Sequence, residues 1–320
     1  MVVRAFIFPG QGSQFVGMAQ DLAAAFTSAR DVLAEVDDTL GQRLSKLMFE
    51  GPAEELTLTE NTQPALMAVS LAVLRVLEQD GNLALPQAAA LVAGHSLGEY
   101  SALAAAGGLS IAETAQLLRL RGSAMQRAVA PGEGAMAALL GTDLEQAQSI
   151  CAEAAIDPET ELRRIVQPAN DNGGGQVVIS GHRDAVERAI EIAKARGIKR
   201  AMLLPVSAPF HCALMAPAAD AMAEALATAT IKAPTVPLVA NISAAKASDP
   251  TELRKLLVEQ VTGMVRWRES VLAMAEMGVN QFVELGAGKV LSGLVRRILP
   301  DATTISIGTP TDIEAFLKSL

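Results

Sequence analysis

Aromatic residues and cysteines are scarce in this sequence, and positive charge is outnumbered by negative charge. Aromatic residues make up 3% of the 320 residues, so a base-stacking surface for single-stranded nucleic acid has little to draw on. The formal net charge of -9 also argues against nucleic acid as the main partner. Cys151 and Cys212 alone form neither a disulfide framework nor a metal cluster. We therefore predict a cytoplasmic protein that binds neither nucleic acid nor a metal.

Long uninterrupted apolar runs are also missing. The stretch from Ala88 to Ile111 is broken by His95, Glu99 and glycines, so it falls short of the roughly 18 residues that a membrane span needs. A strand-like run begins at Val2 without a charged-then-apolar leader, so we expect no secretory signal and no membrane partner. Hydrophobic residues are 50% of the chain, enough for a large core.

Strands and helices alternate in the first and last parts of the chain. Short apolar runs predict buried strands at residues 2–8, 88–93 and 281–285. Helical patterns cover residues 64–77, with Pro64 in the first turn, and residues 97–106, 111–128 and 290–299. Ser110 and Glu113 form a capping-box pattern. We therefore predict an α/β large subdomain with a parallel sheet, built from residues 1–130 and 206–320.

Residues 131–205 follow a different pattern. Strands are expected at 135–140, 164–168, 176–180 and 201–206, and helices at 143–155 and 183–196. This βαββαβ order is typical of the ferredoxin-like arrangement. We predict a ferredoxin-like small subdomain inserted into the larger one.

A nucleophile motif, Gly94-His95-Ser96-Leu97-Gly98, lies between a predicted strand and a predicted helix. The G-x-S-x-G spacing in that context places a serine hydroxyl on a sharp turn near amide N–H groups. The alternative is an inert serine in a tight turn. By elimination among three histidines, His211 in a Pro-containing loop is the candidate base, with a structural histidine as the alternative. No acid is identified to complete a triad, so a neutral acceptor could orient the histidine.

Arg121 falls inside the apolar arc of the helix at residues 111–128, among Leu117, Leu118 and Met125. A buried guanidinium needs an anionic or strongly polar partner. Three interpretations stay open from the residues alone: an ion pair with a core acid, an arginine whose charged end reaches the edge of the core, or a clamp for a substrate carboxylate.

Several strings together resemble the malonyl-CoA:acyl-carrier-protein transacylases of type II fatty acid synthesis. They occur in order over nearly the whole chain: Phe8-Pro9-Gly10-Gln11-Gly12-Ser13-Gln14, Thr62-Gln63-Pro64-Ala65-Leu66, Gly94-His95-Ser96-Leu97-Gly98-Glu99-Tyr100, Leu120-Arg121-Gly122, Gln176-Val177-Val178-Ile179-Ser180-Gly181, Pro209-Phe210-His211 and Glu284-Leu285-Gly286. The resemblance implies an α/β-hydrolase-like large subdomain with a ferredoxin-like insertion.

The resemblance also implies roles for single residues. Ser96 would be the acylated nucleophile, His211 its base and Arg121 the group that holds the malonyl carboxylate. The backbone amides of Gln11 and Leu97 would form the oxyanion hole. Gln260 would orient the histidine through its backbone carbonyl, and Gln63 and Asn172 are expected at the substrate.

The implied reaction moves a malonyl group from malonyl-CoA to the phosphopantetheine thiol of acyl carrier protein, supplying fatty acid synthesis. It passes through malonyl-Ser96, needs no cofactor, and we expect a monomer. Three alternatives stay open: an acyltransferase for another extender such as methylmalonyl-CoA in polyketide synthesis, a serine thioesterase or hydrolase, and a non-catalytic carrier-protein scaffold.

Carrier-protein docking needs a basic patch, because carrier proteins are acidic and this chain is negative overall. The densest basic run contains Lys194, Arg196, Lys199 and Arg200, and a second group begins at Lys289. The alternative is a solvated helix face whose charges favour the helix dipole.

Overall fold

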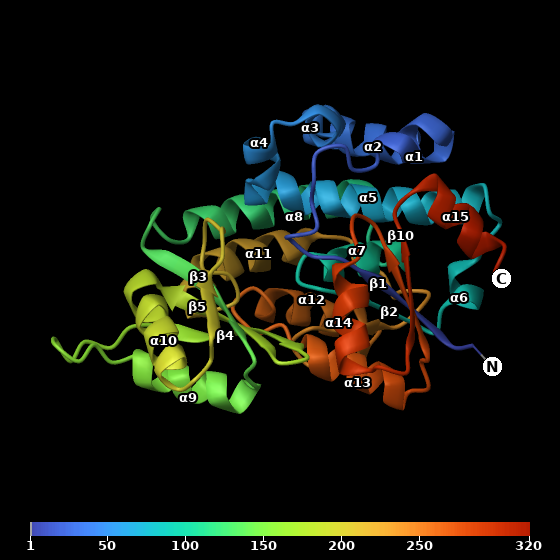
Figure 1. The fold of residues 1–320 in the computed structure, drawn as a ribbon. Helices are drawn as coiled ribbons and strands as arrows, with labels where there is room; N and C mark the ends of the chain where they lie inside the picture. The colour runs from blue at the N-terminus through green and yellow to red at the C-terminus, as the bar shows by residue number, and fades with distance from the viewer. Residues whose placement is uncertain (1) are drawn as a thin grey trace.

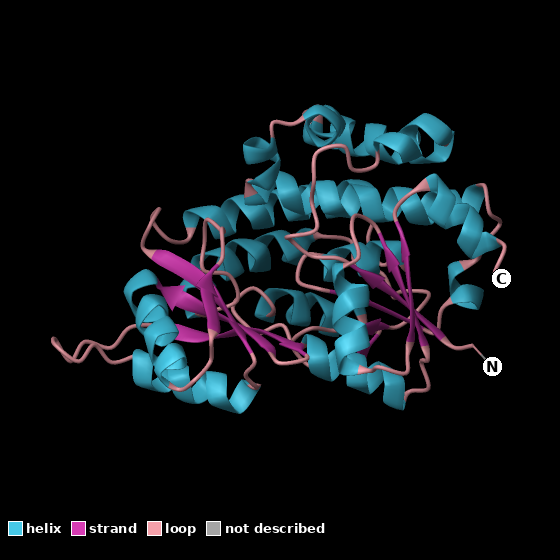
Figure 2. Cartoon of the chain, viewed as in Figure 1, coloured by secondary structure: helices cyan, strands magenta, loops and turns pink. Residues whose placement is uncertain are grey.

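Two separate β-sheets organise the chain in the computed structural model, which describes residues 2–320 (Figures 1 and 2). Met1, the first residue of the predicted segment 1–130, lies outside the described residues. The larger sheet has the order β10-β9-β1-β2-β7-β8 and is parallel except for the β7–β8 pair. Its strands are β1 (Arg4–Phe8), β2 (Leu91–Gly94), β7 (Leu238–Val239), β8 (Lys246–Ala247), β9 (Gln281–Leu285) and β10 (Thr303–Ile307).

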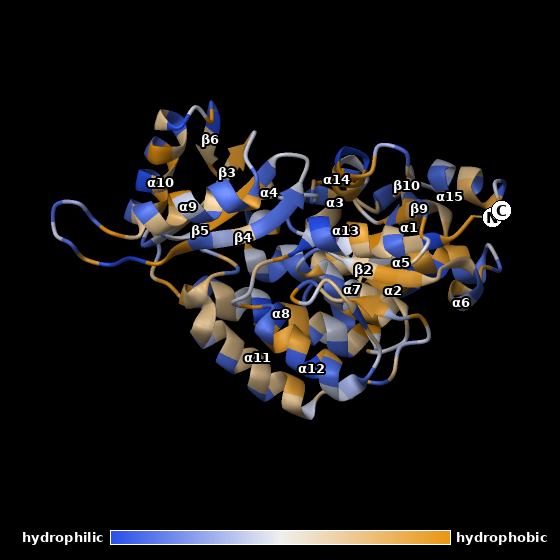
Figure 3. Ribbon diagram, turned by 90° about the horizontal axis from the view of Figure 1, so that it is seen from below, coloured by the Kyte–Doolittle hydropathy of each residue, from blue (hydrophilic) through white to orange (hydrophobic). Residues whose placement is uncertain are grey.

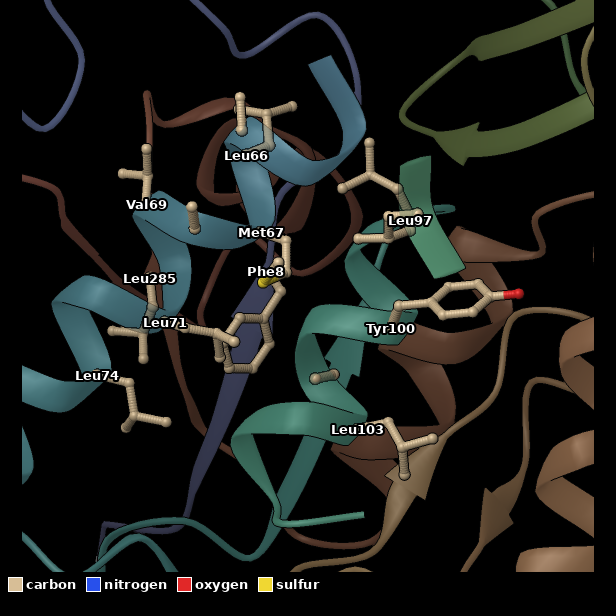
Figure 4. Packing of buried hydrophobic residues seen from close by; sticks show 14 of the residues in the cluster. Phe8, Leu66, Met67, Val69, Leu71, Leu74, Leu97, Tyr100, Leu103 and Leu285 are labelled. Atoms are coloured by element: carbon tan, nitrogen blue, oxygen red, sulfur yellow. The ribbon is translucent and has the colours of Figure 1, made fainter. Parts of the chain in front are cut away.

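Helices cover both faces of the larger sheet. The central strand β1 is apolar on both sides, because successive side chains of a strand point to opposite faces. Phe6 and Phe8 of β1 enter one core, and Figure 4 shows Phe8 beside Met67 and Leu71. Ala5 and Ile7 face a second core. The first core is covered by α5 (Thr59–Gln79), α7 (Gly98–Ala105) and α8 (Ile111–Arg127), and the second by α13 (Trp267–Glu276) and α14 (Val290–Ile298).

The smaller sheet is antiparallel and has the order β4-β5-β3-β6. Ala137 and Leu139 pack with the helices on one face, whereas Met136 and Val178 belong to the core of the larger body. The small sheet is therefore docked against the large one by its own apolar residues. Its elements are β3 (Gly134–Leu140), α9 (Leu144–Ala154), β4 (Val166–Gly173), β5 (Gln176–His182), α10 (Arg183–Ala195) and β6 (Arg200–Leu203).

The remaining helices flank these layers, and Figure 1 shows the N-terminal ones lying above α5. Figure 3 shows that α8 and α10 carry polar as well as apolar residues, as expected of helices with one buried face. Among the described residues, no helix combines the length and the apolar character that a bilayer span requires. The flanking elements are α1 (Gln20–Ala25), α2 (Thr27–Leu40), α3 (Leu44–Glu50), α4 (Ala53–Thr57), α6 (Leu85–Ala88), the 3-10 helix η1 (Ala213–Met215), α11 (Ala216–Thr228), α12 (Pro250–Glu259) and α15 (Pro310–Leu317).

The strand predicted at 88–93 lies at Leu91–Gly94, and the strand predicted at 201–206 ends at Leu203. Two other predicted boundaries are wrong by five residues each. Pro64 lies inside α5, which begins five residues earlier at Thr59, rather than in the first turn. The strand predicted at 164–168 spans Val166–Gly173, because its pairing with β5 continues as far as Gly173. On its other side, Asp171 N donates to Val265 O (3.0 Å) and Val265 N donates to Ala169 O (2.9 Å). Pairing on both sides therefore makes a strand of a polar stretch whose composition is that of a loop. The Ser110 cap is confirmed, since its side chain accepts from Glu113 N.

Candidate active site

Ser96 occupies the turn between β2 and α7, with a left-handed backbone (φ 54°). Such a conformation is strained for a residue with a Cβ and persists only where the surroundings enforce it. Gly94 and Gly98 make the turn possible: a Cβ on Gly94 would lie 1.9 Å from Gly98 C, and one on Gly98 would lie 2.2 Å from Phe8 O. The two glycines therefore allow the close backbone contacts of this turn, and the turn directs the serine hydroxyl away from the backbone.

His211 is the histidine that reaches this hydroxyl, with Nε2 2.7 Å from Ser96 Oγ. Its Nδ1 lies 2.9 Å from Gln260 O and 3.1 Å from Gly263 O. Two carbonyl acceptors assign the proton to Nδ1, which leaves Nε2 free to accept from the serine. Of the other histidines, His95 Nε2 pairs with Asn172 Oδ1 (2.9 Å) and His182 Nδ1 accepts from Ile165 N.

The His211 ring is neutral at physiological pH. Burial and, next, the positive charge of Arg121 lower its pKa to about 3, and the hydrogen bonds to Gln260 and Gly263 oppose this only in part. His211 is 3% exposed. The ring is therefore in the proton-accepting form that a serine nucleophile requires.

Arg121 is 1% exposed and lies beside the same hydroxyl. Its Nη2 donates to Ser96 Oγ (3.2 Å) and Gln260 Oε1 (2.8 Å), and Nη1 donates to Gln63 Oε1 (2.9 Å). Among residues 2–320, no carboxylate oxygen lies within 4.0 Å of its nitrogens, so Arg121 forms no direct ion pair there, and the buried Glu99 acts on its charge only from a longer distance. Gly122 brings α8 against α5, since a Cβ there would lie 2.6 Å from Glu60 Cα.

Behind the serine lies a polar cluster that sequence reasoning missed. Asn241 follows β7, accepts from Ser96 N (2.8 Å) and donates to Gly94 O (2.6 Å). Glu99 accepts from Gln260 Nε2 (2.7 Å). Glu99 had one signal, a lone charge within an apolar stretch, and Asn241 had another, a polar residue directly after a buried strand.

A cavity of about 790 Å³ opens between the two sheets and is bordered by Ser96, His211 and Arg121. Gln11, Gln63, Leu97 and Asn172 also line it. Neither Gln11 N nor Leu97 N donates to another group in the part of the chain that the structure describes, so both amides remain available. Within residues 2–320, no group of His, Cys, Asp or Glu is arranged to hold a metal ion.

The candidate docking residues lie apart from these groups, on exposed positions. Lys194 pairs with Glu191 (2.8 Å) and Arg196 pairs with Glu153, so acidic neighbours offset part of the basic run. Lys199, Arg200 and Lys289 are exposed. Lys289 directly precedes Val290, which lines the cavity.

A serine on a strained turn, a neutral histidine in contact with it and a buried guanidinium at 3.2 Å define a serine-dependent acyl-transfer site. The chain belongs to the malonyl-CoA–acyl carrier protein transacylases of the acyl transferase domain family, whose model matches residues 5–308. It is 47% identical to the malonyl CoA-acyl carrier protein transacylase of Escherichia coli K12, over 99% of this chain and 100% of the relative.

Two solved structures are similar over almost their full length. The acyl-carrier-protein S-malonyltransferase of Bartonella henselae has a TM-score of 0.95 and 56% identity, covering 99% of both chains. A malonyl-transacylase in complex with its type II polyketide synthase acyl-carrier protein has a TM-score of 0.94 and 43% identity, covering 99% of this chain and 100% of that chain. The resemblance stated from the sequence is therefore confirmed.

The lowered pKa of His211 predicts an unusual pH profile for the reactivity of Ser96. With an uncharged serine-directed phosphonate, the labelling rate should stay nearly flat from about pH 8.5 to 5.5, because the ring stays neutral above its pKa of about 3. Intact mass spectrometry at timed intervals measures this rate. A histidine with an ordinary pKa would give about a tenfold fall by pH 5.5, and that result would contradict the assignment.

Proposed function

We propose that the protein transfers the malonyl group of malonyl-CoA to the phosphopantetheine thiol of acyl carrier protein. One observation carries the choice of substrate: the buried guanidinium of Arg121 forms no direct ion pair with any described residue and lies 3.2 Å from the serine hydroxyl. An acyl group with a free carboxylate supplies the missing anion at this distance from the nucleophile. The names of the relatives support the same substrate and acceptor.

The first half-reaction acylates Ser96. His211 Nε2 takes the hydroxyl proton as Oγ attacks the thioester carbonyl, and the amides of Gln11 and Leu97 stabilise the oxyanion. As the tetrahedral intermediate collapses, the carbon–sulfur bond breaks and His211 returns the proton to the CoA sulfur. Malonyl-Ser96 remains.

The second half-reaction repeats these steps with the carrier protein's thiol as nucleophile. His211 takes the thiol proton, the sulfur attacks the ester carbonyl, and the proton passes to Ser96 Oγ as the ester bond breaks. The same base and the same oxyanion hole act in both half-reactions. No cofactor takes part in this scheme, and the acyl and thiol groups come with the substrates.

Arg121 selects the acyl group. The malonyl carboxylate accepts hydrogen bonds from the guanidinium, which Gln63 and Gln260 hold in place, and Asn172 borders the same cavity. An uncharged acyl group leaves the buried charge unpaired, and this penalty lowers its rate of transfer.

The two-sheet arrangement supports the predicted division into subdomains. We assign residues 1–130 and 206–320 to an α/β-hydrolase-like subdomain and residues 131–205 to a ferredoxin-like insertion. The basis is the mostly parallel order of the larger sheet and the antiparallel order β4-β5-β3-β6 of the smaller one. The cavity between them then holds the acyl group against both.

Fatty acid synthesis is the proposed destination of the malonyl group. A polyketide pathway is the second candidate, because one similar structure contains a type II polyketide synthase carrier protein. The candidate carriers can be compared as acceptors of the same malonyl-enzyme.

Ser96→Ala should abolish both the malonyl-enzyme and the transfer of malonate to holo-carrier protein, because the attacking oxygen is gone. Intact mass spectrometry after mixing with malonyl-CoA measures the first, and the mass of the carrier protein measures the second. Ser13→Ala is the matched control, since this serine lines the same cavity and should be dispensable for acylation. A Ser96→Ala protein that still gains the malonyl mass would refute the mechanism.

Arg121→Ala should lower kcat/KM for malonyl-CoA by about 30- to 150-fold, or roughly 2–3 kcal/mol, because charge-assisted hydrogen bonds to the carboxylate are lost. Acetyl transfer should hold or rise, because no buried charge is left unpaired. The comparison uses purified protein, holo-carrier protein and each acyl-CoA. An equal fall for both acyl groups would make Arg121 a purely structural residue.

For the carrier protein, we propose docking on the exposed basic residues that border the small sheet and the cavity mouth. In the basic run, Lys194 and Arg196 already pair with acidic side chains. Lys199 and Arg200 are exposed and are therefore the members of the run that we expect to contact the carrier protein. Lys289 supplies positive charge beside the cavity. An acidic partner is attracted to such local charge in spite of the negative net charge of the chain.

Charge reversal tests this docking surface. Lys199→Glu with Arg200→Glu should slow transfer to the carrier protein several-fold at low salt and flatten its salt dependence. Acylation by malonyl-CoA should stay unchanged. Lys318→Glu, next to α15 at the opposite end of the molecule from the small sheet (Figure 1), is the matched control. Unchanged transfer in the double variant would move docking to the surface around Lys289.

A further inference from the structure

Glu99 is a buried carboxylate that the proposed mechanism does not use. It lies in the first turn of α7, three residues after Ser96, and is 0% exposed. Its Oε2 accepts from Gln260 Nε2 (2.7 Å) and from Asn241 N (3.1 Å). No Lys or Arg among the described residues forms an ion pair with it. Its contacts are therefore those of an acceptor within the polar cluster behind the serine.

The side chain of Gln260 depends on this acceptor. Its Nε2 donates to Glu99 Oε2, to Ser96 O (2.9 Å) and, at 3.3 Å, to Asn241 Oδ1. Its Oε1 accepts from Arg121 Nη2 (2.8 Å). An amide has one donating and one accepting end, so holding Nε2 toward Glu99 presents Oε1 to the guanidinium.

We propose that Glu99 is a positioning residue for carboxylate recognition, acting through Gln260 to hold Arg121 beside the serine. The inference rests on the proposed function and deepens it. Glu99 borders neither the cavity nor the serine hydroxyl, and its hydrogen-bonded connection to Arg121 passes through Gln260. Its charge, where present, also acts on the guanidinium directly. The competing reading is a carboxylate that only stabilises the start of α7 through the helix dipole.

In this role Glu99 needs an oxygen that accepts from Gln260 Nε2, but it does not need a full negative charge. Burial raises the pKa of Glu99 to about 7, so both protonation states are present near neutrality. In both states one oxygen can accept from Gln260 Nε2. A glutamine side chain offers the same oxygen at the same reach, whereas leucine fills the space without an acceptor.

The test compares Glu99→Leu with Glu99→Gln in malonyl and acetyl transfer to holo-carrier protein. Glu99→Leu should lower the malonyl-to-acetyl ratio of kcat/KM by about tenfold or more, because Arg121 loses its fixed partner. Glu99→Gln should keep that ratio within about threefold of the unmodified protein. Labelling of Ser96 by an uncharged phosphonate should change little in either variant.

A double-mutant cycle decides whether the effect passes through Gln260. Glu99→Leu combined with Gln260→Leu should lower the ratio no further than Gln260→Leu alone. Multiplied effects, or an unchanged ratio in Glu99→Leu, would overturn the proposal. If Glu99→Leu does not fold, Gln260→Leu alone must lower the ratio, and a retained ratio overturns the proposal as well. An unmodified protein that does not prefer malonyl would instead refute the proposed function.

Discussion

A buried positive charge that forms no direct ion pair within residues 2–320 is the constraint around which the site is built. Removing an arginine from water costs several kcal/mol unless other groups replace its hydration. The side-chain oxygens of Gln63 and Gln260 accept hydrogen bonds from the guanidinium, and the ring of Tyr100 lies 5.7 Å from the guanidinium carbon. These groups are neutral, so they stabilise the charge without neutralising it. The carboxylate of an anionic acyl group would neutralise the charge of Arg121.

The same charge shapes the base. Burial and, next, the charge of Arg121 lower the pKa of His211. The carbonyl oxygens of Gln260 and Gly263 take the place of a triad acid at Nδ1 of the ring. A carboxylate bound to Arg121 would offset that charge and make His211 a stronger base. Substrate recognition and proton transfer are therefore coupled through Arg121. Gln260 contacts Arg121 with its side chain and His211 with its backbone carbonyl.

Sequence reasoning reached the residues that carry local signals. The glycines around Ser96, the apolar arc around Arg121 and the βαββαβ sequence of elements in residues 131–205 are visible in short windows, and the structure brings Ser96, His211 and Arg121 together. The strands β7, β8 and β10 of the larger sheet were not predicted. Asn241 and Glu99 were missed because their partners lie 145 and 161 residues away. The full length of β4 was missed because its polar end has the composition of a loop, and it is its pairing with β5 and with the distant Val265 that makes it a strand.

A high-resolution crystal structure of the malonyl-enzyme tests the central claim most directly, because it measures where the carboxylate lies. We predict both carboxylate oxygens about 2.7–2.9 Å from guanidinium nitrogens of Arg121, with the ester on Ser96 Oγ. Gln63 and Gln260 should still hold the arginine. A carboxylate turned toward solvent, away from Arg121, would contradict the account.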